Sequence, residues 1–101
     1  DSLVVKILTD KEDGVLAVRD DEKKLCAVAY CDETLIFPFA DYKSCTLDTE
    51  GKIVLNLSLV DKTYSITISS GKFKNTSIVG KQLLSMANKM KNFLDEMIDE
   101  S

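Results

Sequence analysis

Histidine is absent from this sequence of 101 residues. It is the commonest general base and the commonest metal ligand, and Ser-His and Cys-His nucleophile pairs need it. The remaining residues do not assemble into a nucleophile with a base and an orienting group. We therefore expect a protein that is not an enzyme and that holds no cofactor and no metal.

Long apolar runs, proline and glycine are also scarce. No segment approaches the roughly 18 consecutive apolar residues of a transmembrane helix, and no signal-peptide pattern is visible. With one proline and four glycines, the composition is neither collagen-like nor linker-like. These absences favour a cytoplasmic protein. Because the chain begins with Asp1, a removed targeting segment stays open as the alternative.

The three cysteines, Cys26, Cys31 and Cys45, are an odd number, and no two of them have CxxC spacing. A small secreted disulfide scaffold carries an even and larger number of cysteines. We expect reduced thiols in the core of a cytoplasmic protein. A Cys26–Cys31 or Cys31–Cys45 bridge remains the alternative for an exported chain.

The overall charge is weakly acidic, with a formal net charge of -4 and a pI near 4.7. Proteins that bind DNA or RNA usually present a basic face, so no nucleic acid partner is expected. An acidic surface of this size is typical of a soluble protein, although it can also mimic DNA toward a basic partner. A hydrophobic content of 45% and a charged content of 30% argue for a single folded domain over residues 1–101.

Short β-branched and apolar segments alternate with charged or glycine-containing turns, which predicts a series of strands between residues 3 and 68. The small side chains of residues 25–30 suggest close packing. Pro38 lacks the amide hydrogen that a central strand needs, so we expect an edge or a corner there. The first five strands are expected at residues 3–9, 15–19, 25–30, 34–37 and 41–49.

The last two strands have the clearest pattern. Every second residue from Ile53 to Leu59 is apolar, and the same period of two recurs over residues 63–69. Asp61 and Lys62 separate the two segments and suit a tight turn. The pattern predicts a β-hairpin.

From about residue 77 the apolar residues recur at steps of three and four, which predicts an amphipathic helix over about 77–99. Asn75, Thr76 or Ser77 can supply the N-cap oxygen. Carboxylates in the last turns oppose the helix macrodipole, so we expect the final turn to fray or the natural chain to continue beyond Ser101.

The apolar stripe of this helix contains Met86, Met90 and Met97, which we expect to pack against the sheet. The stripe is also wide. A homodimer is the alternative use of its flank, with a second copy packed on partly exposed apolar residues there. These flanking residues are Ile78, Leu84, Phe93 and Ile98.

About seven strands joined by short turns must pair in an antiparallel manner. We therefore expect a mainly β (α+β) fold, in which a curled sheet or a PH-like barrel is followed by one long C-terminal amphipathic helix.

Two segments carry a resemblance to a known family. They are DDEKKLCAVAY, a charged turn followed by a hydrophobic strand, and ETLIFPFADYKSCTL, with Phe39, Asp41 and Tyr42 at the matching places. The chain resembles PH-like (pleckstrin-homology-like) domains of bacteria and their phages. The resemblance implies a PH-like fold and a binding role, and it brings no catalytic motif.

A fold of this kind can bind a protein partner in a groove between sheet and helix, or along an edge strand. We expect the partner to contact the helix flank or the edge near Pro38. The candidate partner-binding residues are Phe37, Phe39, Tyr42, Leu84 and Phe93.

A weak anion site is a further candidate, formed by Lys62, Lys72 and Lys74. A phosphoinositide site would need clustered basic residues on the first hairpin, where the turn DKEDG carries three carboxylates and one lysine. Binding to membrane lipid is therefore not expected. The carboxylates of this turn, including Glu12, and those of residues 20–22 lack the spacing of a calcium loop and suit solvated turns.

The sequence thus predicts a non-catalytic interaction module that binds a protein partner. One alternative is an acidic inhibitor or decoy, encoded by a phage, that occupies a basic site on its target. Another is a weak binder of anions or anionic lipid.

Overall fold

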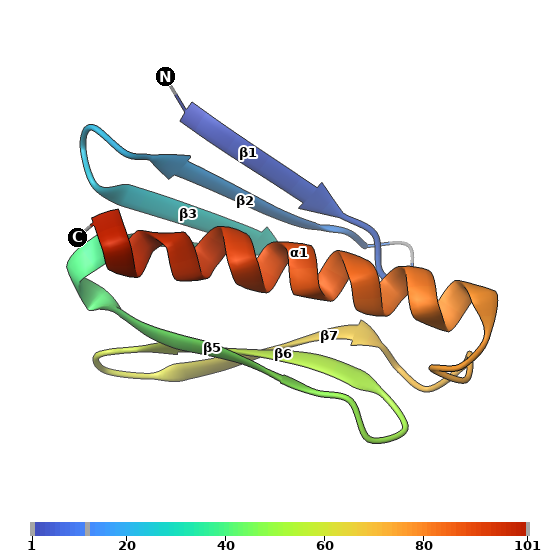
Figure 1. Ribbon diagram of the computed structural model, residues 1–101. Coiled ribbons are helices and arrows are strands. Elements are labelled where there is room, and N and C mark those ends of the chain that lie inside the picture. Colours follow the sequence, from blue (N-terminus) through green and yellow to red (C-terminus); the bar gives the residue numbers. More distant parts are fainter. Residues whose placement is uncertain (1, 12, 101) are drawn as a thin grey trace.

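The computed structural model describes residues 2–11 and 13–100, so Asp1, Glu12 and Ser101, which belong to the predicted domain of residues 1–101, lie outside the described part. Seven antiparallel strands form two sheets, and one helix follows them (Figure 1). The predicted mainly β fold with a C-terminal helix is confirmed. Within the described residues, the strands form two separate sheets and not a closed barrel.

The first sheet has four strands in the order β1-β2-β3-β4, so every strand pairs with its neighbour in the chain. One face of this sheet points to the core, and the inward side chains of β2 include Val15, Ala17 and Arg19. Its strands are β1 (Ser2–Ile7), β2 (Val15–Asp20), β3 (Leu25–Tyr30) and β4 (Glu33–Pro38).

The second sheet has the order β5-β6-β7 and contains the predicted hairpin. Ile53, Leu55 and Leu57 are fully buried, as their period of two predicts. The hairpin closes with a hydrogen bond from the amide of Leu59 to the carbonyl of Lys62. The three strands are β5 (Tyr42–Asp48), β6 (Ile53–Leu59) and β7 (Thr63–Ser69).

The chain passes from one sheet to the other at Pro38, which is the last residue of β4. A short 3-10 helix, η1 (Phe39–Asp41), makes the turn and buries Phe39 in the core. The predicted corner at Pro38 is confirmed, because proline ends the pairing of β4 where the chain leaves the first sheet. Away from this corner the sheets meet again, where the amide of Asp10 donates to the carbonyl of Ile68.

The helix α1 (Ile78–Glu100) lies between the two sheets (Figure 1). Its N-cap is Ser77, whose hydroxyl accepts a hydrogen bond of 3.0 Å from the amide of Gly80. Gly80 is buried so closely against the preceding loop that a Cβ there would lie 2.0 Å from the carbonyl oxygen of Lys74. The structure describes α1 as helical through Glu100, so the last turn does not fray within the described residues.

The core is formed by the inward faces of the two sheets and by one side of α1. Met90, Leu94 and Met97 are completely buried, so most of the apolar helix stripe packs against the strands, as expected for its methionines. Ile78 and Ile98 are exposed instead, at 79% and 52%. No helix in the described ranges is both long enough and apolar enough to cross a membrane.

Candidate partner-binding groove

An open groove of about 530 Å³ runs between α1 and the edge strand β1. Val5 contributes from β1, while all the other lining residues come from one side of the helix: Ser85, Asn88, Lys89, Asn92, Phe93 and Glu96. The helix residues recur at steps of three and four, because such residues share one face of an α-helix. The groove therefore has one wall from a strand and one from a helix.

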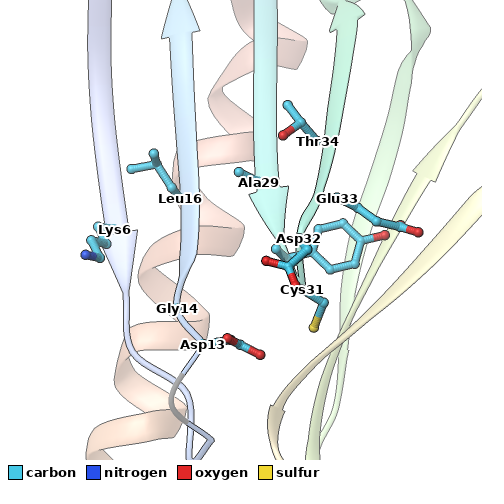
Figure 2. Close-up of a pocket in the computed structure, with 10 residues that line it drawn as sticks. Lys6, Asp13, Gly14, Leu16, Ala29, Cys31, Asp32, Glu33 and Thr34 are labelled. Atoms are coloured by element: carbon cyan, nitrogen blue, oxygen red, sulfur yellow. The ribbon is translucent and has the colours of Figure 1, made fainter.

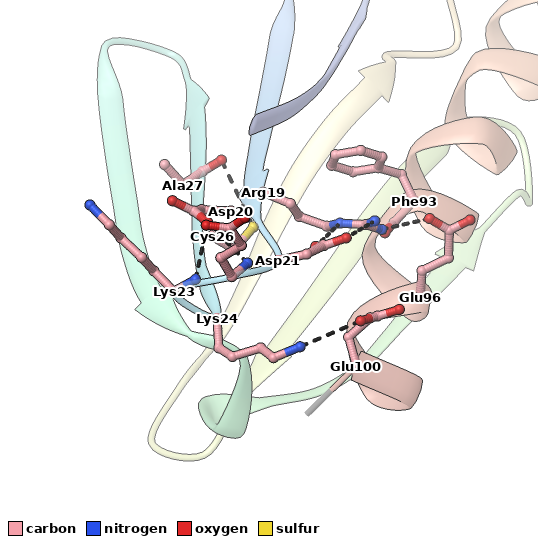
Figure 3. A network of polar contacts seen from close by, with 11 residues as sticks. Arg19, Asp20, Asp21, Lys23, Lys24, Cys26, Ala27, Phe93, Glu96 and Glu100 are labelled. Atoms are coloured by element: carbon pink, nitrogen blue, oxygen red, sulfur yellow. Dashed lines mark hydrogen bonds and ion pairs between the residues drawn. The ribbon is translucent and has the colours of Figure 1, made fainter. Parts of the chain in front are cut away.

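Arg19 anchors the helix wall of this groove (Figure 3). Its side chain comes from the inward face of β2 and is only 3% exposed. One guanidinium nitrogen donates to the carbonyl of Phe93 and to a carboxylate oxygen of Glu96, both at 2.6 Å. The other two nitrogens donate to the two oxygens of Asp21, at 3.1 and 3.2 Å. All nitrogens of this buried cation are thus satisfied.

Burial lowers the pKa of Arg19, but hydrogen bonds to Glu96 and Asp21 outweigh that effect and raise the pKa above its ordinary value. The guanidinium also stacks on the ring of Phe93, with 4.5 Å between the central carbon and the ring centroid. Arg19 therefore remains charged and fixes Phe93 and Glu96, which both line the groove.

The polar side chains on the groove wall are mostly available to a ligand. Within the described residues, Asn88 donates to the carbonyl of Leu84, whereas no hydrogen bond or ion pair involves the side chains of Ser85, Lys89 or Asn92. Amide groups both donate and accept hydrogen bonds. The wall can therefore bind peptide groups or polar side chains without a requirement for one sign of charge.

The structure places the five predicted partner-binding residues in different environments. Phe37, Phe39 and Tyr42 are 4%, 2% and 6% exposed, so they belong to the core and offer almost no surface to a partner. Phe37 and Phe39 flank Pro38, and the chain turns at this corner in such a way that both rings point into the core. Leu84 is half-buried and packs against the core. Phe93 also belongs to the core, at 8% exposed, and it lines the groove with the little surface it has.

Tyr42 has a structural role that its sequence position does not reveal. Its hydroxyl donates to Asp95 at 2.6 Å, and Lys91 donates to the second oxygen of the same carboxylate. Burial, followed by the contact with Asp95, raises the pKa of Tyr42. This network joins β5 to the helix.

The three lysines of the predicted anion site do not come together. Lys62 lies in the β6–β7 turn, where its amine is 5.0 Å from the centroid of the Tyr64 ring. Lys72 and Lys74 follow the other end of β7, and the strand between them is about 20 Å long. A single anion therefore cannot contact all three amines.

The cysteines are free thiols, with Cys26 and Cys45 buried and Cys31 exposed. Burial raises the pKa of both Cys26 and Cys45 to about 12, so neither is a nucleophile near neutral pH. Among residues 2–11 and 13–100, no group of three or more acidic, cysteine or histidine side chains is arranged to hold a metal ion. Glu12, in the first acidic turn, lies outside the described residues.

A second open depression, of about 400 Å³, lies at one end of the first sheet, where the β3–β4 turn meets the β1–β2 connection (Figure 2). Leu16, Ala29 and Thr34 line it from the outward face of three strands. Lys6, Asp32 and Glu33 surround it with charges of both signs.

The groove residues Val5, Asn88 and Asn92 are absent from the sequence-based candidates, because isolated amides on a helix give no pattern. The position of Arg19 could have been recognised from the sequence. It is in phase with Val15 and Ala17, so period two places a cation on the buried face of β2, and such a cation needs partners.

Comparison of the chain with protein-family models, curated proteins and solved structures gives no match.

Proposed function

We propose that this protein is a non-catalytic interaction module that binds an extended segment of a partner protein in the groove between β1 and α1. The observation that carries the proposal is the combination of an edge strand with a helix wall on which, within the described residues, Ser85, Lys89 and Asn92 have no side-chain hydrogen bond or ion pair. β1 pairs with β2 on one side only, so alternate backbone groups on its other side are outside the β ladder.

An extended peptide is the ligand that such a groove fits. Its backbone can add to β1 as a further strand, while side chains on one face contact α1. Val5 offers apolar contact at the base, where Phe93 is 8% exposed and adds little surface, whereas Asn88 and Asn92 offer hydrogen bonds at the rim. We expect a segment with an apolar residue directed into the groove and uncharged polar residues beside it.

The proposal includes the PH-like relationship and a cytoplasmic location. Four strands, a corner, three strands and a terminal helix are compatible with the resemblance in residues 20–47. Three free thiols in the described residues support a reducing compartment. The lack of histidine supports a role in binding and not in catalysis.

An acidic decoy has less support from the charge arrangement. Several of its carboxylates already contact cations of the same chain: Asp21 and Glu96 contact Arg19, Asp95 contacts Lys91, and Glu100 contacts Lys24. Engaged carboxylates present a weaker field to a basic target than free ones.

The test selects ligands from a display library of short random peptides with the whole protein as bait. A selected peptide is then titrated into the isotopically labelled protein and followed by NMR. We expect shift changes confined to β1 and to the groove face of α1, together with slower amide exchange in β1, because an added strand protects its backbone.

Asn92→Trp is the groove variant, since an exposed indole there would fill the space beside Phe93. Gln82→Trp is the matched control, because Gln82 is exposed on the same helix and does not line the groove. We expect at least about tenfold weaker peptide binding for Asn92→Trp and unchanged binding for Gln82→Trp, with both proteins folded. Shift changes elsewhere, or equal binding by both variants, would refute the proposed site.

A further inference from the structure

The outward face of the four-stranded sheet is apolar, and no element of the described chain covers it. Its side chains form three rows across the strands, because directly paired residues point to the same face. The central row is entirely apolar, with Val4 and Ile36 at its ends, 59% and 74% exposed. From β1 to β4 it contains Val4, Val18, Ala27 and Ile36.

The flanking rows carry one charge each, Lys6 on β1 and Asp20 on β2. One consists of Lys6, Leu16, Ala29 and Thr34, and the other of Ser2, Asp20, Leu25 and Pro38. An exposed sheet face with an uncharged centre is more than scattered surface apolarity, and such a patch marks an association surface.

We propose that this outward face forms the interface of a homodimer, whose two-fold axis runs parallel to the strands between β2 and β3. The inference is independent of the proposed peptide groove, because the groove lies on the other side of β1. In this arrangement β1 of each copy lies over β4 of the other, and β2 lies over β3.

The sizes of the side chains support this axis. β2 presents the large residues Leu16 and Val18, whereas β3 presents the small residues Ala27 and Ala29 at the paired positions. The two-fold axis places Leu16 of each copy over Ala29 of the other, and Val18 over Ala27. Large residues then meet small ones, as interdigitated sheets require. Ala29 also lines the depression that would receive this leucine (Figure 2).

The charges support the same orientation. Lys6 lies at the end of β1 nearest the β3–β4 turn, and within the described residues it has no ion-pair partner. Asp32 lies in that turn, which leads into β4, whereas Glu33 is paired with Tyr30 and is in phase with the inward residues of β4. The proposed axis brings Lys6 of each copy beside Asp32 of the other, which gives two symmetric charge contacts per dimer.

The area of the face sets the strength of the dimer. Four strands of about 4.8 Å spacing and about 20 Å length give roughly 400 Å² for each copy. The total of roughly 800 Å² is below the range of about 1,200 to 2,000 Å² for stable interfaces. We therefore expect a weak, reversible dimer that dissociates on dilution.

The experiment measures mass by sedimentation equilibrium over a wide range of protein concentration. We expect the mass of the unaltered protein to rise from 11.2 kDa toward twice that value. Ile36→Asp would place two charges in the interface and should weaken dimerisation more than about tenfold. Val60→Asp is the matched control, since Val60 is 52% exposed in the β6–β7 turn, away from the face.

Charge reversal tests the axis. Lys6→Glu alone and Asp32→Lys alone should each weaken the dimer several-fold, and the combined variant should restore it. A mass of 11.2 kDa at every concentration would overturn the dimer, and dimerisation of Ile36→Asp at the level of Val60→Asp would overturn the face. A combined variant as weak as the single reversals would overturn the orientation.

Discussion

The central carbon of the Arg19 guanidinium lies 4.5 Å from the centroid of the Phe93 ring, although 74 residues of sequence separate the two. This contact joins the inward face of β2 to the C-terminal half of the helix. It also combines with two short hydrogen bonds to the helix, so a buried charged group connects the sheet and the helix beside the apolar core.

Arg19→Lys tests the energetic weight of this connection. An ammonium group cannot reproduce the forked contacts to Asp21 and Glu96, so we expect a loss of about 2 kcal/mol in the free energy of unfolding. Urea denaturation followed by circular dichroism measures the change. Lys24→Met is the control, because the exposed Lys24–Glu100 pair should contribute less than about 1 kcal/mol. Equal losses of unfolding free energy in the two variants would show that the buried contacts of Arg19 stabilise the fold no more than the exposed Lys24–Glu100 pair.

Stability should fall at alkaline pH. The pKa values of Cys26 and Cys45 are raised to about 12 in the folded protein, first of all by burial, against an ordinary value of 9.0. The folded state therefore holds more protons than the unfolded state above pH 9. Each group then contributes a loss of about 1.4 kcal/mol per pH unit until its folded pKa is reached, while stability below pH 9 is unaffected by them.

Tyr42→Phe isolates one contribution to this pH dependence. The pKa of Tyr42 is raised by burial and by Asp95, so its stabilising effect is complete below its ordinary value of 10.0 and declines above it. We expect the variant to lose about 1 kcal/mol near neutral pH, with the hydrogen bond, and to show a shallower decline above pH 10. Urea midpoints measured at intervals from pH 7 to pH 11 give both quantities. Parallel decline of the two proteins above pH 10 would contradict the assignment.

Gly80→Ala should destabilise the protein, against the helix propensity of alanine. Propensity alone would favour alanine by about 1 kcal/mol. The added Cβ would lie 2.0 Å from the carbonyl oxygen of Lys74, so the loop before the helix must move and a net loss of more than about 1 kcal/mol is expected. Thermal unfolding compares this variant with Gln82→Ala at an exposed site, where little change should appear.

Thiol reactivity should differ among the three cysteines. Cys31 is exposed, whereas Cys26 and Cys45 are buried and their pKa values are raised to about 12. An aromatic disulfide reagent near neutral pH should therefore react rapidly with one thiol in the native protein and with all three in denaturant. Cys31→Ser should abolish the rapid phase. A rapid phase that survives this substitution would show that a buried thiol is accessible.

Much of the fold could be predicted, because its main signals are periodic. Alternation from Ile53 to Leu59 identified β6, and steps of three and four from residue 77 identified α1 to within a residue at each end. Pro38 identified the corner because a missing amide hydrogen is a local property. The sequence did not predict that the strands divide into two sheets, because this division depends on whether β4 pairs with β5, and no local pattern determines that pairing.

The candidate site was harder to predict, because it depends on contacts between distant residues. The sequence places aromatic residues near Pro38 among the candidates for a binding surface, yet Phe37 and Phe39 are buried at the corner. Phe93 could be identified from its position on the helix flank. Val5 and Asn92 line one groove only because β1 lies beside α1, and no local sequence pattern predicts that these two elements are neighbours.

The order of strands has a consequence for how the chain folds. Each strand pairs only with the strand before or after it, so both β meanders can form from local segments at a small entropic cost of loop closure. The helix is the exception, since it reaches back from residues 78–100 to β1 and β2. We expect hairpin formation to precede helix docking, so that substitutions in the β6–β7 hairpin slow folding while Arg19→Lys chiefly accelerates unfolding in stopped-flow measurements.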